Sequence, residues 1–76
     1  YKMPIDKNLS EMLSVYFWID DLEAKEDKTG TLHISFTSES MQHAQDSADF
    51  IADSLDMEEM RVKFDGDKAE ITLGRR

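Results

Sequence analysis

Residues 38–56 have the apolar spacing of one amphipathic helix, and a helix of this kind needs a second layer on which to pack. Ser38 or Thr37 can cap its start, and Glu39 suits the positive end of the helix dipole. The apolar stripe recurs at intervals of three and four residues and consists of Met41, Ala44, Ala48, Ile51, Ala52 and Leu55. Because the stripe is rich in alanine, it can approach a sheet closely, so we expect the helix to lie on strands.

A hairpin signal precedes this helix. Asp27-Lys28-Thr29-Gly30 combines an Asp, which suits the first position of a type I turn, with a Gly that tolerates the left-handed conformation. Residues 31–37 then alternate as a strand does. The residues on the apolar side of that strand are Leu32, Ile34 and Phe36. A hairpin across this turn pairs Ala24 with Ile34 and Leu22 with Phe36.

The segment before the hairpin is predicted as a strand that begins near Leu13. Residues 15–19 are β-branched or aromatic, and all five are poor helix formers. A helix has suitable spacing too, through Leu9, Met12, Leu13, Tyr16 and Ile19, but β propensity favours the strand. On this strand, Val15, Phe17 and Ile19 would face the opposite side of the sheet from Leu22. A β-bulge at Asp20-Asp21 would bring them to the same side, because one extra residue reverses the facing.

Residues 59–73 are predicted as a second hairpin around Asp65-Gly66, a strong short hairpin signal. A two-residue loop at these positions places Lys63 opposite Lys68. It also sets three favourable pairs opposite each other: Met60 with Ile71, Arg61 with Glu70, and Val62 with Ala69.

The predicted order is therefore β-β-α-β-β. We expect one small domain over residues 1–76, with the core at 13–76 and a lead-in segment at 1–12, in which Asp6 to Met12 form either a helical turn or a simple lead-in. The fold class is α+β, with two layers and one helix packed on one face of a four-stranded sheet. The order and lengths over residues 13–73 are similar to the β-grasp arrangement of small immunoglobulin-binding domains of the protein L and protein G type. That resemblance implies a sheet whose first and last strands lie parallel in the centre, and it assigns no functional residue.

Charge gives the first functional prediction. The chain has nine basic and seventeen acidic residues, a net charge of −8, and it has no Lys or Arg between Lys28 and Arg61. Like charges three or four residues apart cost a helix a few tenths of a kcal/mol each. The outer side of the predicted helix nevertheless carries Glu39, Asp46, Asp49, Asp53 and Asp56.

We expect these five carboxylates to form a partner-binding surface. The protein is then a small regulator or inhibitor that docks on a basic protein surface. If that partner binds nucleic acid, the carboxylates stand in for phosphates. The simpler interpretation is an acidic face that serves solubility or adaptation to salt.

A second candidate surface is the sheet face away from the helix. It would carry Tyr16, Trp18, His33, Arg61 and Lys63. Aromatic residues beside cations suit base stacking, and they suit a homodimer interface equally. The net charge counts against direct nucleic-acid binding, and a structural subunit of a larger assembly is a further alternative. The simpler interpretation is that the chain start folds back and covers the aromatic residues with Met3, Ile5, Leu9 and Met12.

Other classes find little support in the residues. The chain has no cysteine, which removes disulfides, thiol catalysis and cysteine zinc sites and favours the cytoplasm. No apolar run approaches the roughly 20 residues that cross a bilayer. His33 and His43 are too few for a metal site. With no nucleophile elbow and no Gly-rich phosphate loop, we expect neither an enzyme nor a cofactor.

Overall fold

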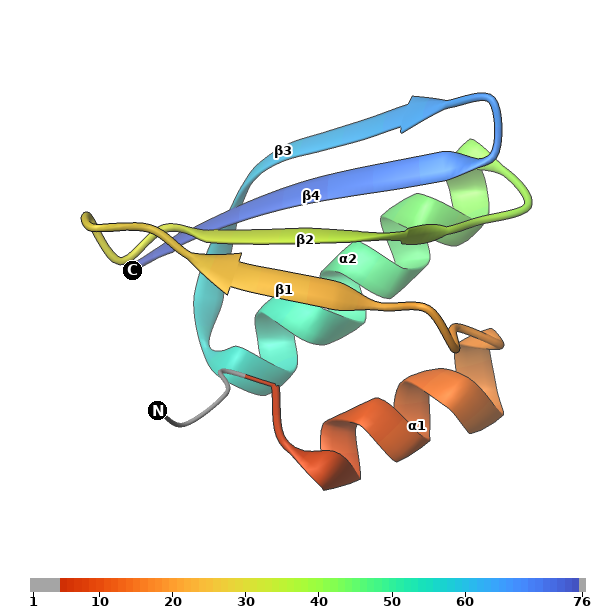
Figure 1. Ribbon diagram of the computed structural model, residues 1–76, viewed down its shortest axis with the longest axis horizontal. Coiled ribbons are helices and arrows are strands. Elements are labelled where there is room, and N and C mark those ends of the chain that lie inside the picture. Colours follow the sequence, from red (N-terminus) through yellow and green to blue (C-terminus); the bar gives the residue numbers. More distant parts are fainter. Residues whose placement is uncertain (1–4, 76) are drawn as a thin grey trace.

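Residues 5–75 form two helices and one four-stranded antiparallel sheet in the computed structural model, which describes this part of the chain (Figure 1). The α+β class is confirmed, although a helix precedes the expected strands. The elements are α1 (Lys7–Phe17), β1 (Glu23–Glu26), β2 (Leu32–Thr37), α2 (Met41–Leu55), β3 (Met57–Asp65) and β4 (Lys68–Arg75). Neither helix combines the length and apolarity that a membrane span needs.

One core lies between the helices and the inner face of the sheet. Alternate residues of β2 and β4 enter it, and both helices add buried side chains. Its buried members are Ile5, Leu9, Leu13, Ile19, Leu32, Ile34, Phe36, Ala44, Ala48, Ile51, Ala52, Ala69, Ile71 and Leu73. The opposite sheet face is covered by neither helix (Figure 1).

The predicted strand from Leu13 is wrong, because Lys7–Phe17 is the helix α1. Asp6 caps its start, and the Asp6 carboxylate accepts a hydrogen bond from the backbone N–H of Leu9 at 2.8 Å. Leu9 and Leu13, one turn apart, are buried in the core. Burial along this helical stripe outweighs the β propensity of residues 15–19.

Two linked expectations fail with that strand. Residues 7–12 are the first half of α1 rather than a lead-in, and residues 18–22 connect α1 to β1 without the bulge expected at Asp20-Asp21. Ile5 and Leu9 pack into the core, and Met12 is exposed, so these three do not cover the outer sheet face. Met3 lies outside the described residues.

The first hairpin is confirmed. Ala24 pairs with Ile34 as expected, and the turn closes on Gly30, whose φ of +86° favours glycine. Leu22 lies just before β1 and packs partly against the core.

The strand order corrects the β-grasp expectation. The order is β1-β2-β4-β3, so β2 and β4 lie in the centre and run antiparallel, and β1 lies at an edge. β1 contributes only Ala24 to the core, whereas β2 and β4 bury alternate apolar residues. The central positions therefore go to the two strands with the most apolar surface to bury.

The helix expected at 38–56 is confirmed as α2, with Ser40 as its cap. The Ser40 hydroxyl accepts a hydrogen bond from the backbone N–H of His43 at 3.1 Å, so neither Thr37 nor Ser38 has this role. Ala44, Ala48, Ile51 and Ala52 of the predicted stripe are buried, Leu55 is half-buried and Met41 is 45% exposed. Ser47 is buried as well, and its hydroxyl donates to the carbonyl of His43 at 2.8 Å.

His43 joins α2 to the end of α1. Its Nε2 donates to the carbonyl oxygen of Phe17 at 2.6 Å, and its Nδ1 lies 2.6 Å from the hydroxyl of Ser38. The Phe17 ring also packs against the ring of Phe50 on α2, with centroids 5.2 Å apart. These contacts fix the C-terminal end of α1 beside the start of α2.

The second hairpin is confirmed, but its register differs from the expected one. The turn residues are Gly66 and Asp67, so Asp65 pairs with Lys68, Lys63 with Glu70, and Val62 with Ile71. Gly66 has a φ of +67°, as the first central position of a type II′ turn requires. This register replaces the unfavourable pair Lys63–Lys68 with two pairs of opposite charge.

The expected inward position of Met60 is also wrong. A bulge between Glu59 and Arg61 leaves Met60 without a partner, and its side chain is 62% exposed. Met60 lies over Gly74, where a Cβ would stand 2.5 Å from its sulfur. Gly74 therefore leaves the room in which the bulged methionine lies.

Candidate functional site

Three exposed aspartates follow one line on α2, on the side opposite the buried stripe. Asp46, Asp49 and Asp53, which we name the acidic row, are spaced by three and four residues, so they lie one above the other on the helix surface. Two of them accept hydrogen bonds from amides on the same helix: Asp46 from Gln42 at 3.0 Å and Asp49 from Gln45 at 3.1 Å. The three residues thus lie on the outer side of the helix, and their role in binding a partner stays a prediction.

No lysine or arginine among residues 5–75 forms an ion pair with the acidic row. Within this part of the chain, the one ion pair joins His33 to Asp27, on the hairpin of β1 and β2. The amides of Gln42 and Gln45 hold the carboxylates without neutralising them. The acidic row therefore keeps its negative charge toward solvent.

Strand β3 widens the acidic row with a fourth carboxylate. The Gln45 amide donates to both Asp49 and Glu59, at 3.1 Å and 2.9 Å. The hydrogen bond with Asp49, together with partial burial and the Asp49 charge, raises the pKa of Glu59. The same contact, with help from Gln45, lowers the pKa of Asp49. Asp53 and Glu58 line the same shallow depression.

Sequence reasoning missed Glu59 because its place depends on β3 lying beside α2. Its charge was visible in the sequence, but the bulge at Met60 decides the side on which it lies. Glu59 pairs with Leu73, a buried residue, and so lies on the face of the sheet that α2 covers.

The other two carboxylates predicted for this surface lie at the two ends of α2. Glu39 precedes the cap Ser40 and lines a separate cleft of about 390 Å³ with Phe17, Trp18 and His43. Asp56 ends the helix with a φ of +54°. The structure therefore brings together three of the five predicted residues and sets Glu39 apart from them.

The second predicted surface is divided between two places. His33, Arg61 and Lys63 lie on the outer sheet face, but Tyr16 and Trp18 belong to α1 and its C-terminal cap. The expected sheet face with aromatic residues beside cations is therefore wrong. Two rows of outward-facing residues cross all four strands, Lys25-His33-Thr72-Arg61 and Glu23-Ser35-Glu70-Lys63, and a third, Thr37-Lys68-Asp65, crosses β2, β4 and β3.

The first row has two cations, a hydroxyl group and the imidazole of His33, and the second has two carboxylates, a hydroxyl group and a cation, so neither row contains Phe, Tyr or Trp. A shallow groove of about 380 Å³ lies over β1, β2 and β4 and is lined mainly by these polar residues. A base-stacking platform needs exposed aromatic rings on its surface. The one ring in these two rows is the His33 imidazole, which Asp27 holds, so the two rows do not form such a platform.

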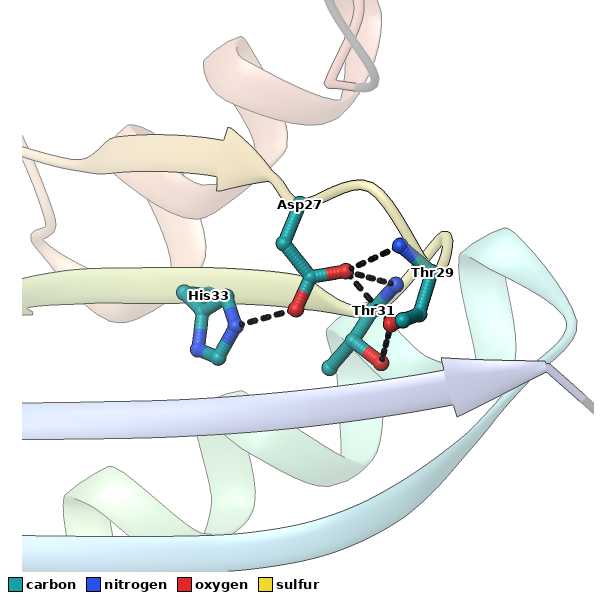
Figure 2. A network of polar contacts seen from close by, with 4 residues as sticks. All are labelled: Asp27, Thr29, Thr31 and His33. Carbon is teal, nitrogen blue, oxygen red and sulfur yellow. Dashed lines mark hydrogen bonds and ion pairs between the residues drawn. The ribbon is translucent and has the colours of Figure 1, made fainter.

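His33 takes part in a network that holds the first turn (Figure 2). One oxygen of Asp27 accepts hydrogen bonds from the backbone N–H groups of Thr29 and Thr31, at 2.9 Å and 3.0 Å, and from the Thr29 hydroxyl. Its other oxygen lies 3.0 Å from His33 Nε2. The Thr29 hydroxyl and then His33 hold the pKa of Asp27 far below its ordinary value. This cluster closes a turn, and residues 5–75 contain no group of three or more ligands suited to a metal ion.

One flank of α1 exposes large apolar side chains, which the strand prediction had placed elsewhere. The exposed fractions are 44% for Met12, 67% for Val15, 66% for Tyr16 and 74% for Trp18. We name these four residues the apolar flank. Trp18 has a φ of +56°, a left-handed conformation that costs a residue other than glycine about 1–2 kcal/mol.

Comparison with known proteins adds no relative to these observations. No protein-family model matches the chain, and neither the curated proteins nor the solved structures gave a match.

Proposed function

We propose that the protein is a small binding module that docks the acidic row of α2 on a basic surface of another protein. It would act by contact, as a regulator or inhibitor, without chemistry of its own. The observation that carries the proposal is the exposed line of Asp46, Asp49 and Asp53, which has no ion pair with a lysine or arginine of residues 5–75. We place this activity in the cytoplasm, as the cysteine-free composition predicts.

The electrostatics of the acidic row favour encounter with a basic partner. The row lies on a molecule of net charge −8, so the local and the long-range fields have the same sign. The raised pKa of Glu59 reflects carboxylates held close together beside the row. A lysine or arginine of a partner that docks on the row would face this group of closely spaced carboxylates.

A partner that normally binds nucleic acid is the sharper form of the proposal. Helix geometry sets the three aspartates about 4.5 Å and 6 Å apart along the axis. One strand of DNA carries a phosphate every ~3.4 Å along its axis, which is a higher density. The row therefore imitates a phosphate backbone only in part, and Glu58 and Glu59 beside it add to the charge.

The test is comparative capture on columns that carry the full chain. One column carries the wild-type protein and a second carries Asp46→Asn, Asp49→Asn and Asp53→Asn together. A third carries Glu23→Gln, Glu26→Gln and Glu70→Gln, which remove the same charge from exposed positions on the sheet. All three are exposed to a lysate of the cells that produce the protein.

The proposal predicts a basic protein that the first and third columns retain, that the second column loses, and that added salt releases. Circular dichroism of each variant establishes that α2 is intact. Equal retention on the second column, or no protein retained preferentially by the wild type, would overturn the proposal.

A further inference from the structure

We propose that the apolar flank of α1 is the interface of a homodimer, formed by a second copy of this chain across a two-fold axis. The flank is made of Met12, Val15 and Tyr16, at helical spacing, and of Trp18 at the helix end. This inference is independent of the acidic row, which lies on the other helix.

The flank differs from the apolar side of α1 that the fold uses. Leu9 and Leu13 point into the core and are 6% and 1% exposed, whereas Val15 and Tyr16 are about two-thirds exposed. The helix thus has two apolar sides, and one of them is left unpartnered by residues 5–75. A side with residues at spacings of three and four suits packing against another helix.

Trp18 supports a functional use of this flank. A helix commonly ends on glycine at a left-handed position, because glycine adopts that conformation without steric conflict. Here the position holds the sole tryptophan of the chain, and the indole is 74% exposed. Strained positions of this kind collect at binding surfaces, and tryptophan is enriched among the residues that dominate interfaces.

Charge identifies the occupant as a second copy. Two molecules of net charge −8 repel each other, and the repulsion is least where the touching surfaces are neutral. The flank has no charged residue, and α1 as a whole has one lysine and one glutamate. By contrast, α2 has three aspartates and no lysine or arginine. An isologous contact needs a self-complementary patch, and two such flanks set antiparallel meet this need.

The area of the flank approaches the lower limit for a specific interface. Aromatic residues bury about 150–250 Å² each, so Tyr16 and Trp18 at 66% and 74% exposure offer roughly 200–350 Å² per copy. The rings of two copies thus give about 400–700 Å², and Met12, Val15 and the polar rim extend this toward the ~1,000 Å² that a specific interface needs. We therefore expect a dimer of moderate affinity.

The experiment is sedimentation equilibrium of the full chain between about 1 μM and 1 mM, a range that covers moderate affinities. Trp18 fluorescence is measured over the same range. The proposal predicts a mass that rises from 8.8 kDa to twice that value, with emission that moves to shorter wavelength in parallel. A mass that stays at 8.8 kDa at the highest concentration would overturn the proposal, whatever the wavelength of the emission.

Charged variants establish which surface is used. Tyr16→Lys should raise the dimer dissociation constant by at least about 30-fold, the loss of one hot spot. Mixing Tyr16→Lys with Tyr16→Glu should restore association, which an unfolded variant could not do. Met60→Glu, at an equally exposed apolar position on β3, is the matched control and should dimerise as the wild type does. Undiminished dimerisation of Tyr16→Lys, or equal loss in Met60→Glu, would contradict the assignment.

Discussion

Truncating Leu13 and Val15 separately distinguishes the helix α1 from the strand that residue preferences favour. On a strand these two residues would share one face, whereas on α1 Leu13 is 1% exposed and Val15 is 67% exposed. Buried Leu→Ala changes cost about 2–5 kcal/mol, and surface changes stay within about 0.5 kcal/mol. We therefore expect Leu13→Ala to lose about 3 kcal/mol of unfolding free energy, and Val15→Ala to lose almost nothing.

The assays are urea unfolding and thermal unfolding followed by circular dichroism, at a concentration low enough to keep the chain monomeric. In a domain of this size, 1 kcal/mol corresponds to a shift in Tm of about 4–8 °C, so Leu13→Ala should melt at least about 12 °C lower. Val15→Ala adds a good helix former at an exposed position, so its Tm should stay close to that of the wild type. Comparable destabilisation by both changes would refute the helix, because it would require Val15 to be buried.

Three further changes test the contact between Glu59 and Asp49, the second turn and the bulge on β3. The raised pKa of Glu59 means that the folded protein loses stability as pH rises from the ordinary value of 4.5 through the raised value. Glu59→Gln should therefore be more stable than the wild type at pH 7 and equally stable near pH 3. The difference at pH 7 should be a few tenths of a kcal/mol, because Asp49 is exposed and Glu59 is only half-buried. An unchanged difference between the two pH values would contradict the close contact with Asp49. Gly66→Ala should lose about 1 kcal/mol of unfolding free energy, because the φ of +67° at this position is strained for alanine. Gly74→Ala should lose less, because the exposed Met60 side chain can move aside. Thermal melts that reverse this order would exclude the turn geometry described.

Local patterns were sufficient for the elements from β1 to β4. The turn at 27–30, the alternation of β2 and the stripe of α2 each depend on neighbours close in sequence, so their types could be predicted. The second hairpin is predicted with its loop one residue too early, which shifts the strand pairing by two residues, so that Val62 pairs with Ile71 and not with Ala69. The residues Asp65-Gly66 suit a two-residue loop at 65–66 and also one at 66–67. The second loop pairs Lys63 with Glu70 and Asp65 with Lys68, and these pairs across the strands decide between the two.

The features that could not be predicted depend on packing between residues that lie far apart in the sequence. The β-branched and aromatic residues 15–17 favour a strand by intrinsic propensity, and the core that buries Leu9 and Leu13 selects the helix. The strand order has the same origin, since it depends on how much apolar surface each strand can bury. The acidic row was predictable because helical spacing alone aligns it, whereas Glu59 joined it through the sheet.

The salt dependence of binding tests the central claim most directly. The measurement is the Kd of the captured basic protein at several salt concentrations, for the wild type and for the variant with asparagine at positions 46, 49 and 53. We predict that the variant binds more weakly at low salt and that its Kd changes less with salt, because fewer charges are screened. Equal Kd values with equal salt dependence would show that the partner does not bind the acidic row.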